Sequence, residues 1–299
     1  MANGGIIGPT NDPVQERNVT SFTSTAPGGH TFHPTTDAID YLVVAGSGGR
    51  NPTGIGNSGT GAGGLLVSES NFATPVTPGG TTGAITIGGG GGTGSQGSPS
   101  SIAPGGGLGP ISTTGGAQGK ARGQPGAAGG SGSGGGDGYP SNTTSGGPGT
   151  PGQGNSGGPG GPGEPSGGGG GYGGAGGAPG GHPQYGPGPG YSTDMASPTS
   201  APVTLQYAVG GNGEGAPSDS GFGNNPAWID AGNPTNGTGR DNSGMGTLYG
   251  DSSAGIVIIS ENGNRPVVAS GVWSLQEQFA QKKVEFGHNE FFCRIKFRK

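Results

Sequence analysis

Residues 154–165 read GNSGGPGGPGEP, with glycine at every third position from 154 to 163. The same spacing recurs in other registers at 146–152 and 170–176. A three-residue period is that of the polyproline-II conformation, which makes no hydrogen bonds within its own helix. With glycine on the contact sides, such helices can lie side by side and pair their N–H and C=O groups laterally. The spacing therefore predicts a polyglycine-II-like block, with a disordered chain as the alternative.

The same stretch fits neither a protease nor a collagen. Gly154–Pro159 differs by one letter from the GDSGGP box of trypsin-like proteases, but a serine nucleophile needs a base, an acid and an oxyanion hole in a rigid site. Ser156 has no apolar scaffold around it in the sequence, and a triple helix needs an unbroken glycine register, whereas this one slips after four glycines. We therefore expect no catalytic residue and no enzyme.

Other motifs that suggest a ligand fail on their spacing. Leu42–Gly49 resembles the strand and loop of a dinucleotide site, but Asn51 stands where the fingerprint needs glycine. Gly119-Lys120 lacks the Ser or Thr of a phosphate loop. His30 and His33 are three residues apart, so on a strand their rings point to opposite faces. We expect neither a cofactor nor a metal.

Composition favours backbone packing over an ordinary core. The 299 residues include 80 glycines and 27 prolines, and only 26% are hydrophobic and 10% charged. So few large apolar side chains cannot fill an ordinary interior at native density. A single cysteine, Cys293, excludes an internal disulfide framework. The start of the sequence does not resemble a signal peptide and no stretch is long enough for a membrane span, so we expect synthesis in a cytoplasm.

Charge is distributed unevenly. The chain has a net charge of −5, yet residues 282–299 hold six cations and two carboxylates, a balance of +4. The remaining residues therefore sum to −9. A mildly acidic body with a basic tail argues against nucleic acid as the main partner.

These patterns predict a mostly irregular and β fold in four ranges. Residues 1–87 form an N-terminal β-framework, 88–200 the polyglycine-II-like block, 201–269 strands and variable loops that complete the framework, and 270–299 a short helix and a basic strand. Strands are expected at 38–45 (buried on both faces), 65–67, 84–87, 203–209 and 255–260, and a hairpin is expected across 20–32.

Two groups of residues are candidates for contact with other molecules. Aromatic side chains among Gly, Ser and Asn are typical of adaptable binding loops, which points to loops at 182–192 and 211–242. The receptor-binding candidates are His182, Tyr185, Tyr191, Phe222 and Trp228, whereas Tyr172 is expected to fill a gap between glycine segments. The attachment candidates are apolar residues of the last range, which could instead form a cap on the protein's own body: Val272, Trp273, Leu275, Phe279, Ile295 and Phe297.

Several segments together resemble one family. Gly4–Pro9 (GGIIGP), Tyr41–Gly46 (YLVVAG), Gly61–Leu66 (GAGGLL) and Gly255–Ile259 (GIVII) are similar to the glycine-rich domain of bacteriophage tail-fibre and other virion proteins. The sequence VWSL at 272–275 resembles C-terminal segments of such proteins, whereas Val284–Lys299 departs from them.

This resemblance implies a virion structural protein of the fibre-tip adhesin type, in which polyglycine-II helices carry variable receptor-binding loops. The expected partners are other virion proteins, a protein or glycan receptor on a bacterial surface, and further copies of the chain, for example in a trimer. The expected location is the virion, outside the cell after assembly in the host cytoplasm. The alternative is a structural subunit of a capsid fibre or extracellular filament that binds no receptor.

Overall fold

The computed structural model describes residues 17–24, 29–52, 56–69, 72–163, 165–177, 186–196, 204–213, 241–247 and 251–262. They belong to one compact unit, Gln15–Asn264, which combines segments from the first three predicted ranges. The described residues contain strands and irregular segments and no helix, so the protein is mostly β and irregular. The predicted C-terminal helix and basic strand lie outside the described residues.

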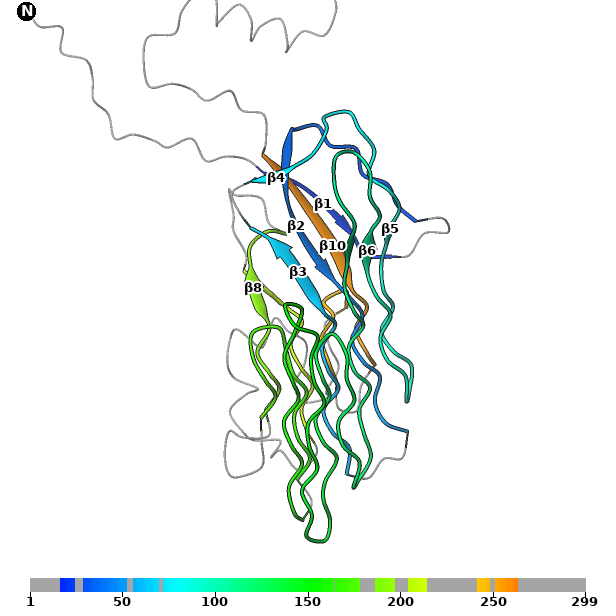
Figure 1. The fold of residues 1–299 in the computed structure, drawn as a ribbon, viewed down its shortest axis with the longest axis vertical. Helices are drawn as coiled ribbons and strands as arrows, with labels where there is room; N and C mark the ends of the chain where they lie inside the picture. The colour runs from blue at the N-terminus through cyan, green and yellow to red at the C-terminus, as the bar shows by residue number, and fades with distance from the viewer. Residues whose placement is uncertain are drawn as a thin grey trace, which may run out of the picture. The chain divides into compact units, whose positions relative to one another are not determined.

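The main sheet is antiparallel, has strands of different lengths and lies toward one end of the unit (Figure 1). Its order is β1-β10-β2-β3, and β4 pairs with the start of β2. The two central strands are rich in β-branched residues, which suits a strand buried on both faces. The bounds are β1 Arg17–Phe22, β2 Ala38–Val44, β3 Leu65–Ser68, β4 Thr74–Pro75 and β10 Ile256–Asn262.

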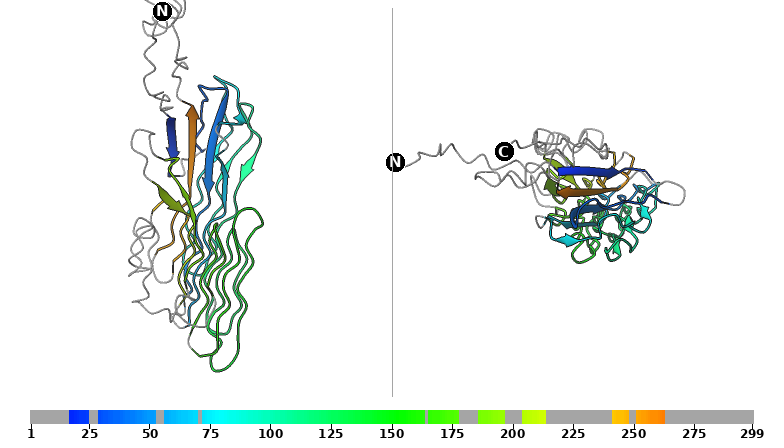
Figure 2. Two further views of the ribbon diagram at one scale, coloured as in Figure 1. Left: turned by 90° about the vertical axis from the view of Figure 1, so that its left-hand side faces the viewer. Right: turned by 90° about the horizontal axis from the view of Figure 1, so that it is seen from above.

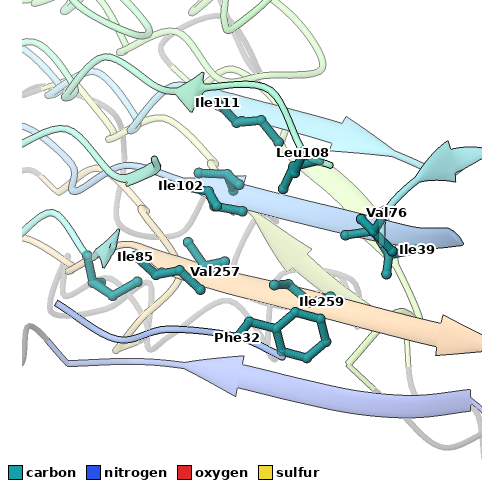
Figure 3. Packing of buried hydrophobic residues seen from close by; sticks show 11 residues of the cluster. Phe32, Ile39, Val76, Ile85, Ile102, Leu108, Ile111, Val257 and Ile259 are labelled. Atoms are coloured by element: carbon teal, nitrogen blue, oxygen red, sulfur yellow. The ribbon is translucent and has the colours of Figure 1, made fainter. Parts of the chain in front are cut away.

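Two smaller sheets accompany the main sheet, and the buried hydrophobic residues form two clusters. The small sheets are β5 (Ile85–Thr86), β6 (Ser101–Ile102) and β7 (Ile111–Ser112), and separately β8 (Tyr191–Thr193) and β9 (Leu205–Tyr207). One cluster joins Val43 and Val257 to side chains of β5, β6 and β7 (Figure 3). The other joins Leu42 and Ile258 to Met195 and Tyr207. Alternate residues of β2 and β10 therefore enter different clusters, which confirms that these strands are buried on both faces.

Glycine-rich segments continue from the strands and run side by side away from the sheet (Figures 1 and 2). Their hydrogen bonds repeat every three residues. In the 154–165 stretch, Asn155 donates to the Gly171 carbonyl and Gly158 to the Gly168 carbonyl, so both bonds reach the same neighbouring segment. Gly157 donates to Gly147 and Gly160 to Thr144, which lie on a second neighbouring segment.

Residues 59–64 give the fullest example of this pattern. Their N–H groups donate in turn to three segments, with Gly59 and Ala62 reaching Gly167 and Gly170. The carbonyl groups of residues 59–64 accept hydrogen bonds from N–H groups of three other segments. The six neighbouring segments are 45–48, 114–117, 131–134, 167–170, 210–211 and 244–247.

The close approach of backbones explains why glycine is required here. A Cβ atom built on Gly61 or Gly134 would lie well under 3.0 Å from a carbonyl oxygen of the adjacent segment, that of Ser131 or Gly167. Real Cβ atoms essentially never come so close. The glycine content is therefore a packing requirement at these positions.

One prediction about local structure needs correction, and a second is shown only in its coarser form. The expected hairpin across 20–32 is not formed, because β1 pairs along its whole length with β10 and His30 bridges to Ile85. For 88–200 the structure shows only the coarser part of the prediction, because the described residues of that range form short strands and irregular segments. These segments form hydrogen bonds with other segments instead of along their own chain.

Candidate functional site

A group of turns lies where the glycine-rich segments end, away from the sheet. We call the described residues 50–52, 92–95, 120–124 and 137–143 the distal turns. Backbone hydrogen bonds connect them: Gly94 donates to the Arg50 carbonyl, and Gly123 donates to the Asp137 carbonyl. Gly119, next to Lys120, donates to Gly49, next to Arg50. Turns that are far apart in sequence therefore form one surface.

Tyr139 is the side chain on this surface that most suggests recognition. It is 56% exposed and is the one large hydrophobic residue so exposed among the described residues. The guanidinium carbon of Arg122 lies 4.8 Å from the centre of its ring, within the range of a cation–π interaction. An exposed aromatic ring with a cation beside it is a common element of binding surfaces.

A buried carboxylate fixes the position of this arginine. The Asp137 side chain is fully buried, and the Arg122 Nε atom donates to it, at 2.8 Å from Oδ1 and 3.0 Å from Oδ2. A buried carboxylate is stable only when it is paired, so Asp137 holds Arg122 in place from beneath. The Asp137–Pro140 turn thus supplies both the anchor for Arg122 and the ring that Arg122 contacts.

The distal turns also concentrate positive charge. Arg50, Lys120 and Arg122 are three of the four described cations, and Arg17 at the opposite end of the unit is the fourth. Among the described residues, the carboxylates in this region are the buried Asp137 and the exposed Asp251, whose neighbour Ser252 donates to the Gly91 carbonyl. The exposed charge of these described residues is therefore net positive, although the whole chain is acidic.

The predicted receptor-binding residues are mostly outside the described part of the chain. His182, Tyr185, Phe222 and Trp228 lie outside it, as do all six attachment candidates, so these remain predictions. Tyr191 is described, and it lies in β8 beside the main sheet, not in the distal turns.

Tyr191 is part of a polar cluster that fastens β8 to the main sheet. Its hydroxyl donates to Glu69 Oε2, and the Thr193 hydroxyl donates to the other oxygen of that carboxylate. Arg17 pairs with Asp194 at 3.0 Å. Burial, followed by the hydrogen bond and negative charge of Glu69, raises the pKa of Tyr191 well above its ordinary value of 10.0.

Tyr172 packs against Tyr191 edge to face, with ring centres 5.4 Å apart and an interplanar angle of 80°. It belongs to the cluster formed by Leu42 and its neighbours, and the Asn155 amide donates to its carbonyl. This agrees with the expectation that Tyr172 fills a gap.

Tyr139 and Arg122 are not among the candidates predicted from the sequence. The feature that could have indicated Tyr139 is the Asp137-Gly138-Tyr139-Pro140 sequence, whose residue types are typical of an exposed turn.

Within the described residues, no group of three or more His, Cys, Asp or Glu side chains could hold a metal ion. No helix in that part of the chain is long and apolar enough to cross a membrane. Comparisons with protein-family models, with curated proteins and with solved structures find no match to this chain.

Proposed function

We propose that this protein is a non-enzymatic fibre or fibre-tip adhesin of a bacteriophage virion, and that its distal turns contact a receptor on a bacterial surface. The observation that carries the proposal is that the sheet and the distal turns lie at opposite ends of one unit. Arg17 and Asn262 are paired in register, so the chain enters and leaves the unit at the sheet end. The exposed Tyr139 and its neighbouring cations lie among the distal turns, where the glycine-rich segments end.

The scaffold between these ends is, in this proposal, a bundle of polyglycine-II helices. Such helices have a three-residue repeat, no internal hydrogen bonds and lateral bonding to neighbours. Two observations support this. In residues 59–64 and 155–160, N–H groups three residues apart donate to the same neighbouring segment, and residues 59–64 form hydrogen bonds with six neighbouring segments. The three-residue glycine spacing and the resemblance of the GAGGLL and GIVII segments to virion glycine-rich domains point the same way.

A filament or capsid-fibre subunit that binds no receptor is the second candidate, and one observation favours it. Among the described residues, Asp37, Glu69 and Asp194 are exposed or half-exposed carboxylates near the sheet end, and the described cation there is Arg17. The distal turns carry the opposite net charge, so two copies could associate end to end.

Cell binding separates the two candidates. Fluorescently labelled protein is incubated with a panel of bacterial strains, beside a variant in which residues 139–142 are replaced by Gly-Ser-Gly-Ser. The adhesin proposal expects binding to some strains by the original chain and its loss in the variant, with unchanged thermal unfolding. The filament candidate expects no cell binding and a salt-sensitive increase of particle mass with concentration, measured by light scattering.

A further inference from the structure

We propose that the ligand of the distal turns is an acidic sugar, meaning a pyranose ring that carries a carboxylate or phosphate group. This inference rests on the proposed adhesin function and assigns a chemical class to its receptor. The residues that would contact the sugar are Tyr139, Arg122, Lys120 and Arg50.

The ring of Tyr139 supplies a platform for the apolar face of a sugar. More than half of this residue is exposed, so its ring is accessible to a ligand. Arg122 lies against the ring at 4.8 Å and is held there by the buried Asp137. The platform is therefore preorganised, which lowers the entropic cost of binding.

The cations supply the preference for an anion. Lys120 and Arg50 lie on adjacent segments, since Gly119 donates to the Gly49 carbonyl at 3.0 Å. With the Gln118 amide oriented so that both of its polar groups have partners, its oxygen accepts from Lys120 Nζ at 2.8 Å, which orients the ammonium group without neutralising it. Asp251 opposes this charge in part, but among the described residues of this region the cations outnumber the exposed carboxylates. Arginine and lysine bind carboxylate and phosphate oxygens by charge-assisted hydrogen bonds.

The residues of the distal turns also favour a sugar over a protein partner. A stable protein interface needs a well-packed apolar centre, and the described distal turns offer one large exposed hydrophobic side chain. They offer instead many glycine and serine groups, and sugars are rich in hydroxyls that can pair with exposed backbone N–H and C=O groups.

Titration calorimetry with defined oligosaccharides tests the ligand class. The probes are a galacturonic acid hexamer for carboxylate, a mannose 6-phosphate oligomer for phosphate, and maltohexaose as the neutral control. We expect one acidic probe to bind at least about tenfold more tightly than maltohexaose, which corresponds to ~1.4 kcal/mol. That binding should weaken as salt is added.

Variants locate the site. Tyr139→Ala should weaken binding of the acidic probe about threefold to tenfold, and Tyr139→Phe, which keeps the ring, should change it by less than about twofold. Lys120→Gln and Arg50→Gln should each weaken it about twofold to fivefold. Ser192→Ala, on an exposed position of β8, is the matched control and should leave binding unchanged.

The outcomes keep the two proposals apart. If the protein binds bacterial cells but neither acidic probe more tightly than maltohexaose, the sugar assignment is wrong and the adhesin proposal stands. If it binds neither cells nor probes, both fail. Acidic-probe binding that is insensitive to Tyr139→Ala and to both cation variants overturns the site. Unfolding curves of each variant show whether a loss of binding reflects a loss of folding.

Discussion

Replacing Gly61 by alanine should destabilise the protein strongly, because the new Cβ has no space. Gly61 is buried, and the added carbon would lie well under 3.0 Å from the Ser131 carbonyl oxygen and also close to the Ala117 nitrogen. Ordinary van der Waals contact begins near 3.4 Å. The segments around residue 61 would therefore have to move apart.

The magnitude follows from what that movement breaks. Gly61 N lies 2.9 Å from the Ala117 oxygen, and Ser131 N lies 3.0 Å from the Ala62 oxygen. Losing both hydrogen bonds costs ~0.5–1.5 kcal/mol each, and the remaining overpacking costs ~1–3 kcal/mol. We expect the free energy of unfolding to fall by about 2–6 kcal/mol.

Gly89 provides the matched control for this experiment. It is exposed, nothing lies within 4 Å of a Cβ built on it, and its φ is not in the left-handed region. Gly89→Ala should therefore leave stability unchanged or raise it by up to ~1 kcal/mol, through the entropy of the unfolded chain. Both variants are compared by urea unfolding. If they differ by less than about 1 kcal/mol, close backbone packing does not determine the glycine content.

Three further changes test side chains. Asp137→Asn should lower the free energy of unfolding by ~1–3 kcal/mol, because it removes the negative charge that pairs with Arg122; unchanged urea unfolding would contradict this. The raised pKa of Tyr191 means that its stabilising effect is complete below pH 10 and is lost as pH rises through the folded-state value. Tyr191→Phe should therefore flatten the fall in melting temperature above pH 10, and an equally steep fall in the variant would refute this contribution of Tyr191. Glu261 accepts the Thr35 N–H at 2.6 Å, so Glu261→Gln should cost ~1–2 kcal/mol in the same unfolding assay; a stability equal to the original chain would show that its charge is dispensable.

The sequence predicts the long strands well and their partners poorly. β2 and β10 are runs of β-branched and apolar residues, so their existence and double burial follow from composition. The pairing of β1 with β10 does not follow, because a nearer segment at 31–32 offered a plausible hairpin and no local rule excludes it. β6 and β7 have two residues each in strand conformation, too few to show an alternating pattern.

The candidate site shows a different limit. The three-residue glycine period is visible in sequence, but glycine segments resemble one another so closely that the sequence does not say which of them are neighbours. The meeting of the Arg50, Lys120 and Asp137 turns depends on that order. Tyr191 and Tyr139 look equivalent in sequence, since both stand among Gly, Pro and Ser. The structure separates them through Glu69, which binds the hydroxyl of Tyr191.

The packing of the glycine segments has a consequence for how such a protein can change its ligand. Residues 59–64 have hydrogen-bonded neighbours on six sides, so a side chain added inside the bundle displaces a backbone. At Gly92 and Gly109, where the chain turns or is exposed, nothing lies within 4 Å of an added Cβ. Substitutions that alter recognition without affecting folding are therefore confined to turns and exposed positions. Because most of the lateral hydrogen bonds join backbone groups, they do not depend on the side chains that the turns carry. Under the proposed function, a change of ligand would therefore require new residues around Tyr139 and none among the buried glycine segments.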